Sequence, residues 1–268
     1  MSDLRQRPKH PAERWASRRA VLLVIGVVVV AVVAALIVVL TRDGGSTSDG
    51  SGAAAETSAA SKLGWGKPNR VDYFNGPLGS DWNVYNGPGH NKNGRRSPGA
   101  ISVSDGVLTI DGDSAGTTGG LAWRGGQKYG RWEGRVRAPA SDRSYNALLL
   151  LWPDSENWPV GGEIDFMEMD DSTRQRTSMF VHFGPDDRQL TSRVKADATQ
   201  WHNWAVEWTP DHIATYLDGN EWYRTSNPLA QPPGPMHLCI QLDWFPTNAG
   251  SKVQQSSMQV DWVAQYPL

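Results

Sequence analysis

The stretch Gly161-Gly162-Glu163-Ile164-Asp165-Phe166-Met167-Glu168-Met169-Asp170 sets acids among β-branched, aromatic and other apolar residues. Side chains alternate between the two faces of a strand, so Glu163 and Asp165 share a face while Glu168 would turn toward the apolar one. Burying an unpaired carboxylate there costs several kcal/mol. One extra residue near Phe166-Met167, a β-bulge, would return Glu168 to the face of the other two acids. The segment therefore predicts a bulged strand with three carboxylates on one surface.

Alternation of apolar and polar residues is the dominant pattern of the chain. Residues 236–243 and 258–262 follow it, and each predicts a strand with one buried face. Asp105-Gly106 and Asp218-Gly219 are strong signals of tight hairpin turns. The apolar run 147–152 is too short for a typical helix and is consistent with a central strand. With 28 glycines, 17 prolines and 13 tryptophans, these patterns predict an all-β domain of two packed antiparallel sheets.

Three closely spaced acids on a strand allow more than one interpretation. A solvated strand face is the ordinary one. Calcium binding is a second, although calcium ligands usually come from a flexible turn and not from a β-branched, aromatic strand. Like charges along one strand destabilise each other and raise at least one pKa. Hydrolysis of a glycosidic bond needs such a set, with one carboxyl protonated and another ionised.

The segment Glu163-Ile164-Asp165-Phe166-Met167-Glu168 resembles the E-x-D-x-x-E signature of glycoside hydrolase family 16, in the bulged form of its laminarinase-like members. The resemblance covers residues 71–266, because further segments resemble family landmarks in the same order: 82–90, 129–133, 158–159, 205–210 and 260–263. It implies a jelly-roll β-sandwich whose concave sheet forms a sugar-binding cleft. It also implies a double-displacement reaction that retains the anomeric configuration.

The resemblance assigns a role to each of the three acids. Glu163 would be the nucleophile, Glu168 the general acid and base, and Asp165 the neighbour that holds the nucleophile and tunes its charge. The expected activity is that of an endo-β-glycanase, cutting a polysaccharide with β-1,3 or mixed β-1,3/1,4 linkages. A transglycosylase of the same family, a catalytically silent carbohydrate-binding module and a purely structural domain are the alternatives.

Tryptophans near the signature are candidates for sugar binding, because the C–H faces of sugar rings stack on flat apolar surfaces. Trp158, five residues before Glu163, is the first choice. Trp123, Trp152 and Trp244 are further candidates, and core packing is the alternative for all four. Four other tryptophans are expected in the core: Trp132, Trp204, Trp208 and Trp262.

Polar candidates for the cleft come from family position. His182 lies between Val181 and Phe183 and faces away from them, and the family often has a histidine on the strand after the signature; simple solvation is the alternative. Asn86, Arg95 and Gln241 would bind sugar hydroxyls, with an ordinary exposed position as the alternative. The chain departs from the common Trp-Pro-Ala-x-Trp pattern before the signature, having 145–149 followed by Trp152-Pro153. The identity of the stacking rings is thus open.

Four segments are expected: a basic cytoplasmic tail 1–19, a transmembrane helix 20–40, a flexible Gly/Ser/Ala linker 41–64 and the jelly-roll domain 65–268. Residues 20–40 carry no charge, and a helix of that length spans roughly 30 Å of hydrocarbon. A signal peptide is the alternative, but its apolar region runs only about 7–15 residues. Six basic residues precede the span, which places the amino terminus in the cytoplasm and the catalytic domain outside the cell membrane.

Charge and cysteine content limit the partners. Of the 26 basic and 28 acidic residues, six basic and two acidic ones precede residue 41, so the rest carries a net charge of −6. Nucleic acid is therefore not expected as a partner. The single cysteine, Cys239, excludes an internal disulfide and a cysteine-ligated zinc site, and is expected to be a small buried hydrophobe. We expect a monomer with no required cofactor; some family members bind structural calcium, but no ligand spacing here demands it.

Overall fold

The computed structural model describes residues 57–268. The predicted cytoplasmic tail (1–19), the predicted transmembrane helix (20–40) and most of the predicted linker (41–64) lie outside the described residues. Within residues 57–268, no helix combines the length and the apolar character that crossing a membrane requires.

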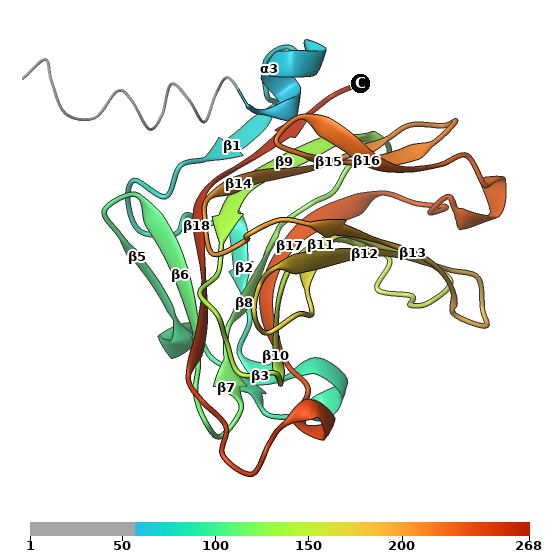
Figure 1. Ribbon diagram of the computed structural model, residues 1–268. Helices are drawn as coiled ribbons and strands as arrows, with labels where there is room; N and C mark the ends of the chain where they lie inside the picture. Colours follow the sequence, from blue (N-terminus) through green and yellow to red (C-terminus); the bar gives the residue numbers. More distant parts are fainter. Residues whose placement is uncertain (1–56) are drawn as a thin grey trace, which may run out of the picture. The chain divides into compact units, whose positions relative to one another are not determined.

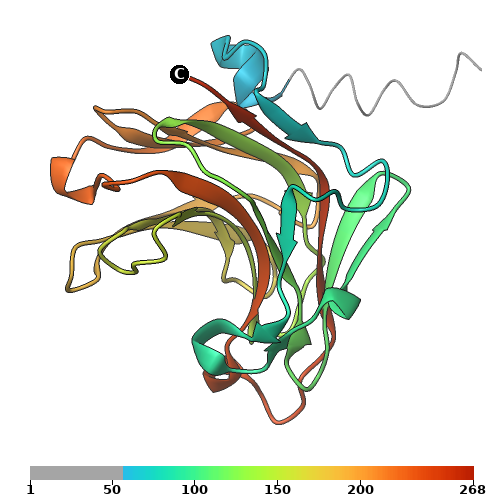
Figure 2. The ribbon, with the colours of Figure 1, turned by 180° about the vertical axis from the view of Figure 1, so that it is seen from behind.

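Two antiparallel sheets packed face to face form the domain (Figures 1 and 2), which confirms the predicted β-sandwich. The eight-stranded sheet runs in the order β16-β15-β14-β9-β18-β6-β5, with β1 also paired to β18. Its strands are β1 (Arg70–Asp72), β5 (Ile101–Ser104), β6 (Val107–Gly112), β9 (Gly130–Arg137), β14 (His202–Trp208), β15 (Ile213–Leu217), β16 (Asn220–Thr225) and β18 (Ser256–Tyr266).

The seven-stranded sheet runs in the order β13-β12-β11-β10-β17-β8-β2. Its strands are β2 (Trp82–Val84), β8 (Gly120–Trp123), β10 (Tyr145–Pro153), β11 (Glu163–Met169), β12 (Arg176–Phe183), β13 (Arg188–Lys195) and β17 (Met236–Trp244). Neighbours such as β10 and β17 lie far apart in the sequence, and such long crossovers are typical of a jelly roll. Strand β17 bends strongly, as Figure 2 shows in orange-red.

Small elements complete the domain. A three-stranded sheet contains β3 (Gly87–Pro88), β4 (Arg95–Arg96) and β7 (Thr117–Thr118). The helical segments are α3 (Ala59–Leu63) and the 3-10 turns η1 (His90–Lys92), η2 (Pro98–Ala100), η3 (Pro228–Ala230) and η4 (Pro246–Asn248). Both predicted hairpin turns are confirmed, because Asp105-Gly106 joins β5 to β6 and Asp218-Gly219 joins β15 to β16, with positive φ at all four residues.

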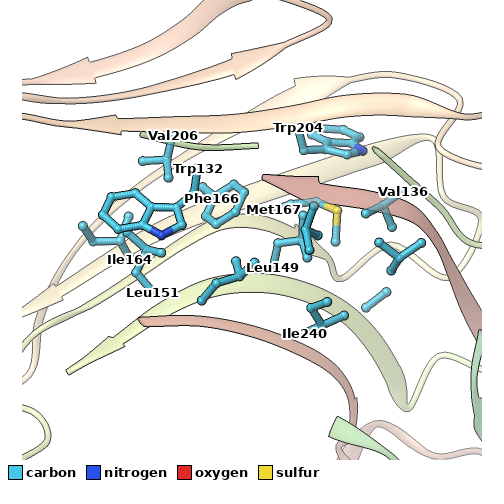
Figure 3. Close-up of a cluster of buried hydrophobic side chains, with 14 of the residues drawn as sticks. Trp132, Val136, Leu149, Leu151, Ile164, Phe166, Met167, Trp204, Val206 and Ile240 are labelled. Atoms are coloured by element: carbon cyan, nitrogen blue, oxygen red, sulfur yellow. The ribbon is translucent and has the colours of Figure 1, made fainter. Parts of the chain in front are cut away.

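The core lies between the two sheets and takes side chains from both (Figure 3). Trp132 and Trp204 from the eight-stranded sheet face Leu149, Phe166 and Ile240 from the seven-stranded one. The predicted core tryptophans Trp132, Trp204 and Trp208 have no exposed surface, and Trp262 packs partly buried on a second cluster. Cys239 is buried as predicted.

Strand β11 contains the predicted β-bulge. Asp165 pairs with Phe180 and Glu168 with Ser178, so three steps along β11 match two steps along β12. The extra residue falls at Phe166-Met167, and both of these side chains lie in the core. Ile164 and Met169 also face the core. The bulge thus lets one strand bury four apolar side chains without turning Glu168 inward.

Helix α3 corrects the predicted linker boundary. Residues 57–64 belong to the folded domain and not to the flexible linker 41–64. Ser58 caps the helix by accepting a hydrogen bond from the amide of Ser61 at 3.0 Å, and Gly64 ends it with φ of 66°. A serine before and a left-handed glycine after are common helix-ending residues. The Ala/Ser composition that suggests a tether is therefore also compatible with a short capped helix.

A buried carboxylate on the eight-stranded sheet holds this helix. Glu133 of β9 accepts hydrogen bonds from the amides of Ala59 at 2.6 Å and Ala60 at 3.1 Å. Burial raises the pKa of Glu133 to about 7. Trp65 follows the helix and packs edge-on against Tyr216 and Tyr266. The linker prediction missed this contact because its partners lie far along the sequence.

Glu133→Ala is expected to lower the free energy of unfolding by about 1–3 kcal/mol, because two amides at the start of α3 lose their acceptor. Urea unfolding at pH 8, where the carboxyl is ionised, measures the change. Glu221→Ala, which removes an exposed carboxylate from β16, is the matched control and should cost at most about 1 kcal/mol. Equal losses in the two variants would contradict the role given to Glu133.

Candidate active site

A cavity of about 1020 Å³ lies on the face of the seven-stranded sheet that points away from the core. Its lining comes from β2, β8, β10, β11, β12, β13 and β17 of that sheet, from β3 and β4 of the three-stranded sheet, and from loops next to them. Along β10 the odd-numbered residues from Tyr145 to Leu151 lie in the core, whereas Leu148, Leu150 and Trp152 line the cavity. The alternation of the strands therefore fixes which side chains reach the cavity.

The three predicted acids meet in this cavity. Glu163, Asp165 and Glu168 all line it, because the bulge at Phe166-Met167 turns Glu168 to the same face of the strand as the other two acids. Asp165 is only 3% exposed, and the two glutamates are half-buried on either side of it along the strand. The arrangement of the acids agrees with the geometry predicted from the sequence.

Burial raises the pKa of all three carboxyls. The charge of Asp165 raises the pKa of Glu163 further, and the charge of Glu168 does the same for Asp165. The pKa of Glu168 rises to about 7, since burial outweighs the hydrogen bond that stabilises its ionised form. The three acids therefore share at least one proton at neutral pH.

Each glutamate accepts a hydrogen bond from one neighbouring side chain. Trp158 Nε1 donates to Glu163 Oε2 at 2.8 Å, and Asn146 Nδ2 donates to Glu168 Oε1 at 2.7 Å. Both bonds favour the ionised carboxylate. Trp158 comes from the loop before β11 and Asn146 from β10, so two different elements fix the two carboxylates.

His182 lies opposite Glu163 in the register of β11 and β12. Its Nε2 is 3.4 Å from Asp165 Oδ2, and its Nδ1 is 2.7 Å from Asp187 Oδ1. The imidazole is therefore held between two carboxyl groups. Ligand atoms of Glu163, Asp165 and His182 lie within 4.8 Å of one another, close enough to hold a metal ion. The same groups already contact each other, Trp158 and Asp187, so the cluster is accounted for by these contacts.

Five of the eight residues predicted to bind substrate line the cavity: Asn86, Trp152, Trp158, His182 and Gln241. The rings of Trp152 and Trp158 are inclined by only 7°, with centroids 6.5 Å apart. Trp158 is 41% exposed, which is far more than a core tryptophan. The two rings thus present flat apolar surface at the end of the cavity next to Glu163.

Two predicted tryptophans lie outside the cavity lining. Trp123 is 2% exposed and stacks on Trp82 inside the domain, because in β8 it is Ala122 that faces the cavity. Trp244 packs over Gly94 and Gly116, where a side chain on either glycine would collide with its ring. The predictions for Trp123 and Trp244 were wrong because ring type alone does not reveal which face of a strand a residue occupies.

Arg95 also lies outside the lining. It is exposed and donates to Asn86 Oδ1 at 3.1 Å. Its neighbour Arg96 lines the cavity instead, is 6% exposed and contacts the side chains of Gln241 and Asp243. β4 has only two residues, so no alternation in the sequence separates Arg95 from Arg96.

Several lining residues escaped the sequence prediction. Asp243 and His237 share the parity of Gln241 along β17, so the alternation of that strand could have identified them. Asn146, which contacts Glu168 without being part of the lining, shares the parity of Trp152 in the same way. Glu156 and Asp187 lie in loops, where no periodicity indicates which way a side chain points.

Comparison with known proteins supports the resemblance. Residues 89–264 match the family model described as glycosyl hydrolases family 16. A "Beta-glucanase" from Rhodothermus marinus is 31% identical over 128 residues, covering 44% of this chain and 43% of that protein. A "Glucan endo-1,3-beta-glucosidase A1" from Niallia circulans is 30% identical over 165 residues, covering 52% and 24%. The chain thus matches less than half the length of these relatives.

Solved structures share the fold. The catalytic domain of an endo-1,3-beta-glucanase from Thermotoga petrophila has a TM-score of 0.64 and 20% identity, with 75% of this chain and 97% of that one covered. LamAcat from Zobellia galactanivorans has a TM-score of 0.67 and 20% identity, with 76% and 99% covered. At this identity the likeness establishes the jelly-roll fold.

Glu168→Gln is expected to stabilise the protein above pH 7. The native carboxyl has a pKa of about 7 against an ordinary 4.5, so the native state binds its proton more tightly than the unfolded state does. Stability from this group is therefore lost as the pH rises from about 4.5 to 7. Glutamine removes that loss and keeps the oxygen that Asn146 contacts.

Thermal unfolding between pH 4 and pH 8 measures this effect. The gain should be about 1–3 kcal/mol above pH 7 and close to zero at pH 4. A gain of the same size at both ends of the range would show that the ionisation of Glu168 is not its cause.

Proposed function

This chain belongs to the glycosyl hydrolases of family 16, and from that membership we propose that it is an endo-β-glucanase acting on β-1,3 or mixed β-1,3/1,4 glucans. The observation that carries the proposal is the convergence of Glu163, Asp165 and Glu168 beside Trp158 in one large cavity. The names of the relatives from Rhodothermus marinus and Niallia circulans support a glucan as the substrate.

Glu163 is the nucleophile of the proposed first step. Its ionised carboxylate attacks the anomeric carbon, forming a bond from carbon to Oε as the glycosidic bond breaks. Trp158 Nε1, at 2.8 Å, favours the ionised carboxylate and holds it in place. Glu168 gives its proton to the departing glycosidic oxygen, and its pKa of about 7 keeps much of it protonated at neutral pH.

Water completes the reaction in the proposed second step. The Glu168 carboxylate formed in the first step takes a proton from water as its oxygen attacks the anomeric carbon. The bond to Glu163 breaks, and its carboxylate is restored. Two inversions give retention of the anomeric configuration. Asn146 donates to Glu168 Oε1 and so stabilises the ionised form that this step requires.

Asp165 holds a proton in this mechanism. Its carboxyl is buried between two glutamates, so ionising all three would place three charges along one strand. A protonated Asp165 can donate a hydrogen bond to Glu163 and keep that neighbour ionised. His182 Nε2, at 3.4 Å from Asp165 Oδ2, approaches the same carboxyl from β12, and Asp187 orients the ring.

We also propose that the enzyme acts outside the cytoplasm as a membrane-anchored, single-pass protein. The support comes from the sequence alone: residues 20–40 carry no charge, and six basic residues precede them. A polysaccharide is too large to enter the cell intact, so an external position brings the cleft to its substrate.

Glu163→Gln is expected to reduce turnover of a soluble β-1,3-glucan by roughly a thousandfold or more, because the amide cannot form the glycosyl ester. Release of reducing ends measures turnover, and thermal unfolding checks that the fold is intact. Glu221→Gln, on the eight-stranded sheet, is the matched control and should keep full activity. A Glu163→Gln enzyme with most of its activity would remove the assigned nucleophile.

Asn146→Ala is expected to move the alkaline limb of the kcat/KM profile to higher pH. The amide of Asn146 stabilises ionised Glu168, so its loss raises the pKa of the acid. Initial rates from pH 5 to pH 9 give the profile, with the exposed Asn220→Ala as control. If the alkaline limb of the Asn146→Ala profile is unchanged, or moves to lower pH, the ionisation of Glu168 does not determine that limb.

A further inference from the structure

The loop between β10 and β11 carries a carboxylate that the proposed reaction leaves unused. Glu156 lies on this loop, lines the cavity and is exposed. Its Oε2 accepts a hydrogen bond from Trp152 Nε1 at 2.8 Å. Its backbone has φ of 54°, a conformation that favours glycine or asparagine, and the turn is closed by a bond from its amide to Pro153 O.

The partners of the other cavity carboxylates show what is particular about Glu156. Asp187 faces His182, and Asp243 faces Arg96. The three acids of β11 are buried and interact with one another. Within residues 57–268, no lysine, arginine or histidine forms an ion pair with Glu156. It is thus an exposed negative charge facing the cavity without a neutralising partner.

Glu156 stands directly beside an aromatic surface. Trp152 packs on a small apolar cluster of Ala122, Leu148, Leu150 and Cys239, of which the first three line the cavity. Its ring is nearly parallel to that of Trp158, which in turn donates to Glu163. Binding at this ring would therefore place a sugar close to the nucleophile, with one edge toward the Glu156 carboxylate.

We propose that Trp152 and Glu156 form a sugar-binding position that selects neutral, unsubstituted rings and rejects rings carrying an anionic group. The indole of Trp152 takes the C–H face of the ring, and the free oxygen of Glu156 accepts hydrogen bonds from hydroxyls at its edge. A carboxylate or sulfate on the ring would instead meet a like charge that no ion pair neutralises. This inference rests on the proposed glucanase function and narrows its substrate class.

Glu156→Gln tests the inference most cleanly, because the amide oxygen can still accept from Trp152 Nε1 while the charge is lost. The probes are a soluble β-1,3-glucan and the same glucan carboxymethylated. We expect the wild type to prefer the neutral polymer by more than tenfold in kcat/KM. Glu156→Gln should narrow that ratio by about fivefold to tenfold, mainly by gaining activity on the anionic polymer.

Control variants separate charge from stacking. Glu221→Gln removes the same charge from the eight-stranded sheet and should leave the ratio unchanged. Trp152→Ala should lower kcat/KM for both polymers by about tenfold, because the stacking surface is lost. Added salt should narrow the ratio of the wild type and have little effect on Glu156→Gln, because screening weakens the repulsion. A ratio in Glu156→Gln equal to that of the wild type would overturn the proposal.

Calorimetric binding distinguishes this inference from the proposed function. In a Glu163→Gln background, which removes the nucleophile, the neutral polymer should bind more tightly than the anionic one, and adding Glu156→Gln should reduce the difference. If the chain binds glucan with this selectivity but cleaves none, the proposed hydrolysis fails and the selectivity stands. If it cleaves glucan without selectivity, the inference fails alone, and if neither polymer binds, both fail.

Discussion

The cost of burying a charged carboxylate shapes strand β11 and the cavity above it. Without the bulge at Phe166-Met167, either Glu168 would enter the core or the apolar side chains would leave it. With the bulge, four apolar residues of one seven-residue strand pack between the sheets while three acids face the cavity. The same constraint explains why a neighbouring strand and a loop supply donors, because Asn146 of β10 and Trp158 of the loop before β11 each compensate one of the glutamates.

The core of the β-sandwich offsets the destabilisation that the three clustered acids cause. Burial raises the pKa of all three carboxyls, so their ionisation opposes folding at neutral pH. A large core between two sheets, with Trp132, Trp204 and Trp208 fully buried, stabilises the fold against that loss. The raised pKa of Glu168 that weakens the native state is also the property that the proposed reaction uses.

Much of this site could be predicted from the sequence because alternation and burial leave few choices. The bulge followed from the position of Glu168 relative to the apolar residues. Trp158, predicted from its place just before the signature, and His182, predicted from its strand after the signature, both line the cavity. Alternation fails where elements are short or every residue is buried. All four residues of β8 are buried, so nothing in its sequence shows that Trp123 faces inward.

Long-range contacts account for the remaining differences. The helix at residues 59–63 is held by Glu133, more than seventy residues away, and no local pattern records that contact. Arg96 lines the cavity instead of Arg95 because its partners, Gln241 and Asp243, lie on a strand far along the chain. The position of a loop such as the one that carries Glu156 depends on the two strands that it joins, β10 and β11.

The central claim is that Glu163 forms a covalent bond with the sugar while Glu168 supplies the proton. An activated 2-deoxy-2-fluoro β-1,3-linked oligosaccharide slows the second step, so the intermediate accumulates and can be located by peptide mass spectrometry. The account predicts a single sugar adduct on the peptide that contains residues 163–168, with fragmentation placing it on Glu163. An adduct on Glu168, or none while the enzyme still turns over the reagent, would contradict it.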